Sequence, residues 1–377
     1  MEASLSPYFF FLPTLPLLYI CWKERERERQ GDGEGRGGRM TRNTLTESPL
    51  LPWRPKILLY GLTFLMNFTR RRNGTINRRL LHLIDLFLKV SANNKPRGGV
   101  KTLDITIDAT RNLWFRLFIP TKTPSDVPLP VIIFFHGGGF AFLSPNVRQF
   151  DHFCRRLSNE IPAVIVSVNY RLSPEHRFPS QYDDGFDTLK FLDEQKLYGF
   201  PENADLSRCF LAGDSAGGNL THHVACRAGK AEFRQVRVIG QISIQPFFGG
   251  EERTESEIRL KRMPIVSMGL TDWLWKAFLP EGENRDHEAV NVMGPRAVDI
   301  TEIEYPETMV VVGGFDPLKD RQREFYKWLR RSWKEAKLIE YPRSVHGFYA
   351  FPEIPDACLF MKEVKGFVHE VSAKFIN

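Results

Sequence analysis

From about residue 100 onward, short apolar segments alternate with longer segments of helical pattern. The apolar segments are continuous, which is typical of strands that are buried on both faces. Strands of this kind form a mostly parallel sheet covered by helices on both sides. We therefore predict strands at 131–135, 163–168, 209–212, 238–244, 308–312 and 337–341, and helices at 182–195, 217–228, 320–333 and 357–375.

The clearest chemical motif lies between a predicted strand and a predicted helix. It reads Gly213-Asp214-Ser215-Ala216-Gly217, a G-x-S-x-G sequence. In this context a sharp turn presents the serine hydroxyl above the edge of the sheet, and the small neighbours avoid collisions. Ser215 is therefore the predicted nucleophile.

A glycine-rich sequence, HGGGF at 136–140, follows another predicted strand. Its glycines allow backbone N–H groups to converge where side chains would obstruct them. We predict that Gly137 and Gly138, together with the N–H of Ala216, form an oxyanion hole. A phosphate-binding loop is the alternative, but the Lys-Ser/Thr pair of a Walker motif does not follow. His136 is interpreted as a structural residue that holds this loop.

A serine hydroxyl needs a base to remove its proton, and nine histidines compete for this role. His346 follows the last predicted strand, where a base is expected beside the carboxyl ends of parallel strands. His222 and His223 lie on the helix behind the serine turn and are interpreted as packing or surface residues. His346 is therefore the predicted general base.

The base needs a carboxylate to orient it. Asp316 lies on the loop after the strand predicted at 308–312, whereas Asp320 fits a helix N-cap. We therefore assign the orienting role to Asp316. The resulting chain order is Ser215, Asp316, His346.

Taken together, these motifs resemble the hormone-sensitive-lipase-like branch of the α/β-hydrolases, and specifically plant carboxylesterases. The residues that carry the resemblance are 136–140, YRLSPEHRFP at 170–179, 213–219, Asp316 and His346. The resemblance implies an α/β-hydrolase fold with a mostly parallel central sheet, helices on both faces and an N-terminal helical lid. It implies hydrolysis of a small carboxylic ester without a metal or an organic cofactor.

The segment 53–86, including RNGTINR at 72–78, also resembles the N-terminal lid of plant gibberellin receptors. In that family the catalytic histidine is replaced, and the pocket binds a hormone. This gives an alternative function, a small-molecule binding protein with little turnover that recruits a protein partner. Because His346 is present in this chain, the sequence favours catalysis.

The chain is expected to have three parts. Residues 1–40 include an alternating Arg-Glu sequence and a glycine-rich stretch, so we predict a disordered leader and hypothesise that Met40 is the true start. Residues 41–100 contain helical patterns at 56–68 and 76–90 and are predicted to be a helical lid; core packing and an amphipathic membrane anchor are the alternatives. Residues 101–377 form the predicted hydrolase domain.

The net charge of +7 arises near the N-terminus, because residues 41–100 hold eleven Lys or Arg against two Asp or Glu. The basic residues bracket a turn and have little aromatic interleaving, so nucleic-acid binding is not expected. We expect no stable membrane insertion. A lipase anchored by 56–72 would have to pellet with liposomes, whereas we expect this protein to stay in the supernatant. Five scattered cysteines favour a reducing compartment, the cytoplasm, with the nucleus as a second compartment.

Aromatic residues near the predicted ends of strands suggest the substrate class. Phe140, Phe247 and Phe248 are predicted to line the pocket, although core packing explains these aromatics equally well. An insertion that contains Trp273, Trp275 and Phe278 is expected to contribute to the lid. We therefore expect an ester with an apolar acyl or alcohol group.

Overall fold

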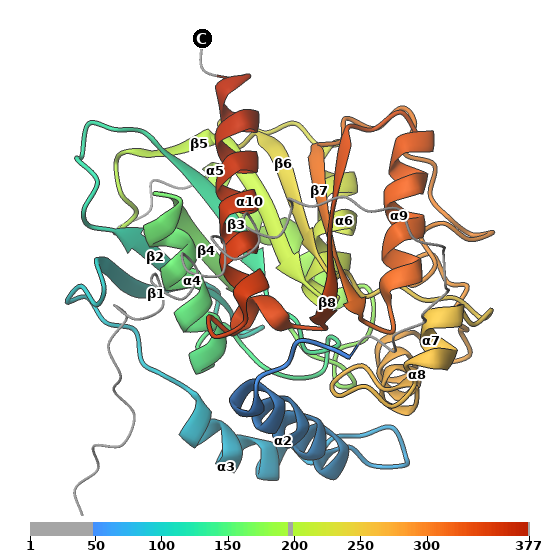
Figure 1. The fold of residues 1–377 in the computed structure, drawn as a ribbon. Helices are drawn as coiled ribbons and strands as arrows, with labels where there is room; N and C mark the ends of the chain where they lie inside the picture. The colour runs from blue at the N-terminus through green and yellow to red at the C-terminus, as the bar shows by residue number, and fades with distance from the viewer. Residues whose placement is uncertain (1–47, 195–198, 376–377) are drawn as a thin grey trace, which may run out of the picture.

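The computed structural model describes residues 48–194 and 199–375, so the predicted leader lies outside the described residues. Within them, eight strands form one sheet in the order β1-β2-β4-β3-β5-β6-β7-β8. The strands from β3 to β8 pair in parallel, and β1 and β2 add an antiparallel hairpin at one edge. The prediction of a mostly parallel sheet is confirmed (Figure 1).

The six predicted strands form the parallel part of the sheet. They are β3 (Leu129–Phe135), β4 (Val164–Asn169), β5 (Ala204–Asp214), β6 (Val238–Ile244), β7 (Glu307–Phe315) and β8 (Ala336–Val345). Strand β3 is buried along its whole length, because helices cover both of its faces.

The antiparallel hairpin was not predicted. It consists of β1 (Val100–Asp108) and β2 (Leu113–Pro120). Strand β1 lies at the edge of the sheet, and its residues range from buried to exposed. Its sequence therefore lacks the continuous apolar run that marks the central strands.

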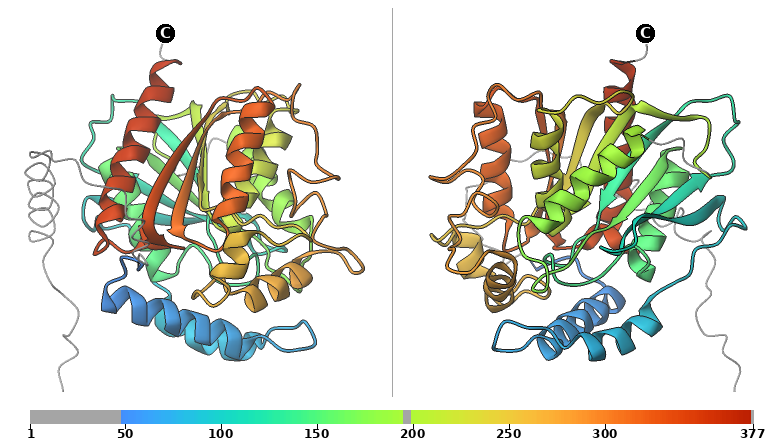
Figure 2. Two further views of the ribbon diagram at one scale, coloured as in Figure 1. Left: turned by 45° about the vertical axis from the view of Figure 1, so that its right-hand side comes forward. Right: turned by 180° about the vertical axis from the view of Figure 1, so that it is seen from behind.

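Helices cover both faces of the sheet (Figures 1 and 2). Helices α4 (Arg148–Glu160) and α10 (Pro355–Ala373) pack on one face, and α4 was not predicted. On the other face lie α5 (Ser180–Glu194), α6 (Ala216–Ala228) and α9 (Lys319–Arg331). In the described residues, one apolar cluster lies on the face of α4 and α10, and two lie on the face of α5, α6 and α9.

Two helices precede the sheet and lie side by side at one end of the molecule (Figure 2). They are α2 (Trp53–Thr69) and α3 (Arg78–Leu88). Near them lies the insertion between β6 and β7, with α7 (Glu255–Arg259) and α8 (Met268–Phe278). In the described part of the chain, no helix is long and apolar enough to cross a membrane.

Candidate active site

The serine turn connects β5 to α6. Ser215 has a φ of 53° and a ψ of −116°, a backbone conformation that residues with a side chain rarely adopt. The end of β6 holds it there, because the Ser215 N–H donates to Ile244 O (2.9 Å) and Ser215 O accepts from the Phe247 N–H (2.8 Å). This turn places Ser215 in the wall of a cavity.

The two motif glycines are required by sterics. A Cβ atom on Gly217 would overlap the carbonyl oxygen of Phe135 at the end of β3, and one on Gly213 would overlap the backbone of Gly217. The turn therefore packs directly against the neighbouring strand, and a side chain at either position would displace it.

The predicted carboxylate and base are in contact. Asp316 follows β7 and is fully buried, and His346 follows β8. His346 Nδ1 donates to Asp316 Oδ2 at 2.7 Å, so its Nε2 is the nitrogen available as a base. Ser215 and His346 line the same cavity. The structure thus brings all three predicted residues to the carboxyl ends of three strands of the sheet.

Two glutamine side chains, which sequence reasoning missed, hold the Asp316 carboxylate. Oδ2 accepts from Gln245 Nε2 (3.0 Å) and from Gln322 Nε2 (2.9 Å), and Oδ1 accepts from the Leu318 N–H (2.9 Å). With His346, this carboxylate has four donors. Such a carboxylate is fixed in orientation and stays ready to stabilise an imidazolium.

Gln245 also holds the loop that carries the histidine. Its Nε2 donates to Val345 O (3.2 Å), and its Oε1 accepts from the Gly347 N–H (2.8 Å). These are the residues immediately before and after His346. The local signal for this role in the sequence is the position of Gln245 directly after β6; in the structure its φ is 46°. One amide therefore ties the loops after β6, β7 and β8 together.

The glycine-rich loop differs from the expectation at one residue. The Gly137 N–H donates to Asp214 Oδ1 at 2.7 Å, so it is not free to face an oxyanion. Within residues 48–194 and 199–375, the N–H groups of Gly138 and Gly139 have no hydrogen-bond acceptor. Gly138 lines the cavity beside Ser215. The geometry therefore leaves Gly138, Gly139 and Ala216 as the candidate donors.

Asp214 is a buried carboxylate that the sequence interpretation did not use. Burial raises its pKa to about 6, although a hydrogen bond with Tyr349 and the nearby His346 oppose this rise. Burial alone would lower the pKa of His346, but Asp316, and to a lesser degree Asp214, outweigh burial and raise it. The base is therefore protonated up to a higher pH than an ordinary histidine.

The cavity beside Ser215 has a volume of about 320 Å³ and is open to solvent. Its wall is mostly apolar, and none of the described residues that form it is Lys or Arg. Much of this wall comes from α2, through Ile57, Leu58, Leu59, Leu62, Leu65 and Met66.

The three aromatic residues predicted for the pocket lie elsewhere. The ring of Phe140 stacks on Phe278 (4.1 Å between centroids), and that of Phe247 stacks on Trp275 (3.9 Å). Phe248 packs against Phe325 of α9 (4.7 Å). None of the three lines the cavity at Ser215, because α8 covers Phe140 and Phe247 instead.

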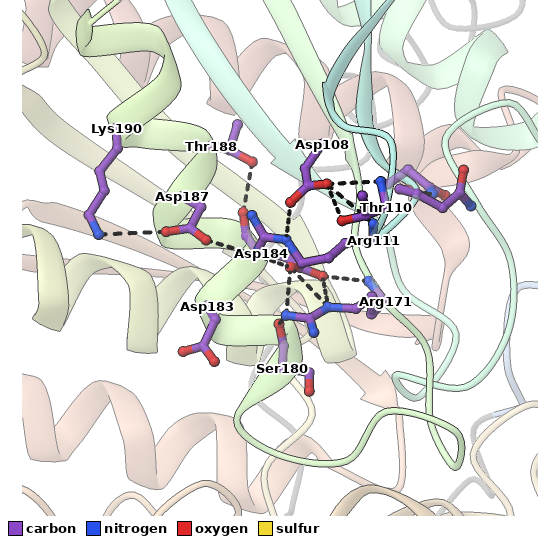
Figure 3. Close-up of polar contacts among 12 residues, drawn as sticks. Asp108, Thr110, Arg111, Arg171, Ser180, Asp183, Asp184, Asp187, Thr188 and Lys190 are labelled. Atoms are coloured by element: carbon purple, nitrogen blue, oxygen red, sulfur yellow. Dashed lines mark hydrogen bonds and ion pairs between the residues drawn. The ribbon is translucent and has the colours of Figure 1, made fainter.

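The block at 170–179 is fixed by ion pairs (Figure 3). Asp184 of α5 is central to these ion pairs. In the structure it is fully buried, where it accepts from Arg171 (2.8 Å) and pairs with Arg111 (3.3 Å). Arg111 also contacts Asp108 and Asp187. This network joins the β1–β2 turn to α5 beside the glycine-rich loop.

The remaining titratable candidates have structural contacts. His222 is buried beside Tyr305, whose hydroxyl lies 2.8 Å from Nδ1, and the ring of His223 stacks on Tyr182. Asp320 is not the N-cap of α9, because that position is Leu318. Its carboxylate instead accepts from the Ser256 N–H (2.8 Å) and links α9 to α7. His136 is fully buried and stacks on a tyrosine ring.

A sharp serine turn after β5 and an aspartate–histidine pair after β7 and β8 define the class of protein as an α/β-hydrolase. The chain belongs to this family, since residues 132–350 match the family described as alpha/beta hydrolase fold.

The relatives divide into receptors and esterases. A gibberellin receptor of Arabidopsis thaliana is 39% identical to this chain. The alignment covers 87% of this chain and 97% of the receptor. Carboxylesterase 20 of the same plant is 31% identical to this chain. This alignment covers 81% of this chain and 96% of the esterase. The structure of the esterase of Pyrobaculum calidifontis superimposes with a TM-score of 0.67 at 25% identity. The superposition covers 85% of this chain and 99% of the esterase. The resemblance to plant carboxylesterases and to the gibberellin receptor is confirmed.

Proposed function

We propose that this protein is a serine carboxylesterase that hydrolyses small, largely apolar carboxylic esters through an acyl-enzyme. The observation that carries the proposal is the 2.7 Å contact between His346 and Asp316 at the cavity that Ser215 lines. A base held in this way has its second nitrogen available for the serine proton.

In the proposed reaction, the Ser215 hydroxyl attacks the ester carbonyl while His346 Nε2 accepts its proton. Asp316 stabilises the imidazolium, and the N–H groups of Gly138, Gly139 and Ala216 donate to the oxyanion. The imidazolium then returns the proton to the departing alcohol. Water repeats the sequence on the acyl-enzyme and releases the acid, so that the reaction needs no metal or organic cofactor.

The cavity supports an apolar substrate. Aliphatic side chains of α2 form much of its wall, and the described wall residues include no Lys or Arg that would pair with a carboxylate. We therefore propose an uncharged ester, with the acyl or alcohol group against α2. Residues 41–100 then act as a lid, residues 101–377 carry the reaction, and the proposed compartment is the cytoplasm.

The second candidate is a gibberellin-receptor-like binding protein. The receptor of Arabidopsis thaliana matches most of this chain at 39% identity, and α2 covers the cavity as a binding lid would. In this alternative the cavity retains a small molecule, and the closed lid recruits a protein partner.

Hydrolysis of p-nitrophenyl butyrate by the purified protein separates the two candidates, with Ser215→Ala as the matched control. We expect turnover by the wild type and a loss of roughly 10⁴-fold or more in the variant. Equal background rates would remove the esterase proposal. Calorimetric titration with a gibberellin supplies the second measurement, since saturable binding by both proteins without turnover supports the receptor.

A further inference from the structure

Helix α2 is apolar on two opposite faces, and the protein covers only one of them. The inner face includes Leu59 and Met66, which are 2% and 3% exposed. On the outer face, large apolar side chains recur every three or four residues and therefore form one stripe along the helix. The stripe comprises Trp53 (66% exposed), Ile57 (63%), Tyr60 (50%), Phe64 (65%) and Phe68 (63%), and of these Ile57 also borders the cavity.

This outer face is the main exposed apolar surface of the described residues. Of the fourteen large apolar side chains that are exposed there, eight belong to α2 or α3. Leu83 and Phe87 of α3 are 58% and 82% exposed, one helical turn apart. A continuous apolar stripe such as the one along α2, where the rings of Phe64 and Phe68 stack at 5.7 Å, marks an interaction surface on a folded protein.

The charges in this part of the chain are predominantly positive. Residues 48–88, which include α2 and α3, contain seven basic residues and one acidic residue, Asp85. Two of these contact the body of the protein, since Arg70 donates to Gly269 O and Arg78 pairs with Glu175. The other five are exposed: Arg54, Lys56, Arg71, Arg72 and Arg79.

We propose that the outer face of α2, with α3, binds reversibly to the surface of an anionic lipid bilayer. A helix with an exposed apolar stripe and basic residues lies in the plane of such a surface. The apolar side chains enter the boundary of the acyl chains, and each basic residue near the surface adds attraction worth a factor of about five in affinity. The 17 residues of α2 lie along the bilayer and do not cross it.

The inner face of the same helix forms part of the wall of the cavity. A bound bilayer would therefore be separated from the cavity by α2, so that apolar molecules dissolved in the lipid reach the cavity over a short path. The binding itself does not depend on ester hydrolysis. It revises the expectation that the protein stays in the supernatant with liposomes, because the sequence could not show which face of α2 is exposed.

Sedimentation of the full chain with lipid vesicles tests this surface. Phosphatidylcholine vesicles are compared with vesicles in which one quarter of the lipid is phosphatidylserine. We expect binding to the anionic vesicles and release in concentrated salt, where screening shortens the reach of the charges to about 3 Å. The Ser215→Ala variant should bind as the wild type does, which separates this result from that of the esterase assay.

Two variants identify the face. Phe64→Ser with Phe68→Ser should lower the affinity for anionic vesicles at least about tenfold, because two exposed rings no longer leave water. Arg71→Gln with Arg72→Gln should lower it about tenfold or more through charge alone. Leu359→Ser on α10, where the leucine is 49% exposed, is the matched control and should change nothing. Equal melting temperatures show that the variants fold.

Fluorescence places the helix relative to the lipid. Brominated acyl chains should quench part of the tryptophan emission, and Trp53→Phe should remove that part while sedimentation persists. Binding that is equal with and without phosphatidylserine, or that survives both double variants, overturns the proposal. Absence of vesicle binding also overturns it, and self-association detected by light scattering would then assign the stripe to a second copy of the chain.

Discussion

The two sides of the cavity are held in place in different ways. On the sheet side, the Asp316 carboxylate is fully buried and has four hydrogen-bond donors. On the helical side, α2 and the turn after it are attached to the insertion by a few hydrogen bonds, such as Ile265 N–H to Thr63 Oγ1 (2.8 Å) and Trp273 Nε1 to Arg71 O (3.0 Å).

This difference separates two tasks. A proton transfer needs atoms held within fractions of an ångström. The many hydrogen bonds at the carboxyl ends of the strands provide this precision. Entry of a substrate needs a part that opens at low cost, and an element with few contacts and many exposed side chains opens more readily. We therefore expect substitutions around Asp316, at the carboxyl ends of the strands, to change kcat. Substitutions that weaken the contacts of α2 and α3 with the rest of the protein should change KM.

The largest effect is expected from Asp316→Asn. The amide keeps the size of the side chain but cannot stabilise the imidazolium, so kcat should fall about 10⁴-fold. Steady-state hydrolysis of a p-nitrophenyl ester measures this. Asp320→Asn is the control, because that carboxylate binds α7 instead of the base. An equal loss of kcat in both variants would contradict the role of Asp316 in holding the base.

Gln245→Ala should have the next largest effect. Without the amide, Asp316 and the loop around His346 each lose a partner, and small displacements of reacting groups cost up to about 10²-fold in rate. We expect kcat to fall roughly 10- to 100-fold with little change in KM. Gln241→Ala, within β6, is the control, since Gln241 contacts Ser243 and Tyr305. An equal loss of kcat there would contradict the positioning role.

The pH dependence should show a smaller effect. His346 must be neutral to act as a base, and its pKa is raised, so kcat/KM should fall as the pH drops through a value above 6.5. Asp214→Asn removes one charge that raises this pKa while leaving an oxygen for the Gly137 N–H. The acid limb of the pH–rate profile should therefore move to lower pH, by less than about one unit. A shift to higher pH would contradict the electrostatic role of Asp214.

The smallest effect on catalysis is expected from Arg78→Ala, at the start of α3. Arg78 donates to both carboxylate oxygens of Glu175 (3.0 and 2.6 Å) and to the carbonyl oxygens of Ala141 (2.8 Å) and Ser173 (2.6 Å). Losing these partly exposed contacts should raise KM about fivefold and leave kcat unchanged. Arg156→Ala, which breaks an ion pair on α4, is the control. A fall in kcat would couple the two sides of the cavity.

The sequence predicted the features that depend on a short stretch of chain. The central strands are continuous apolar runs, and Ser215, Asp316 and His346 each lie at a recognisable strand end. The structure brings these three together, while their catalytic roles stay a prediction.

The features that were missed depend on distant contacts. Gln245 acts on loops that are about 70 and 100 residues away in the chain, as its bonds to Asp316 and Val345 show. The Gly137 N–H was assigned to the oxyanion because nothing local indicates its bond to Asp214. Phe247 was assigned to the pocket because the sequence does not show that Trp275 covers it.

The steric requirement for glycine at 213 and 217 affects how this sequence motif can change in evolution. Since added side chains would collide with backbone atoms of neighbouring segments, these glycines serve the architecture whether or not the serine reacts. A lineage that abandoned turnover and kept only ligand retention would still carry the same five-residue signature. The signature therefore marks ancestry, whereas a histidine held by a buried carboxylate is the better indicator of present-day chemistry.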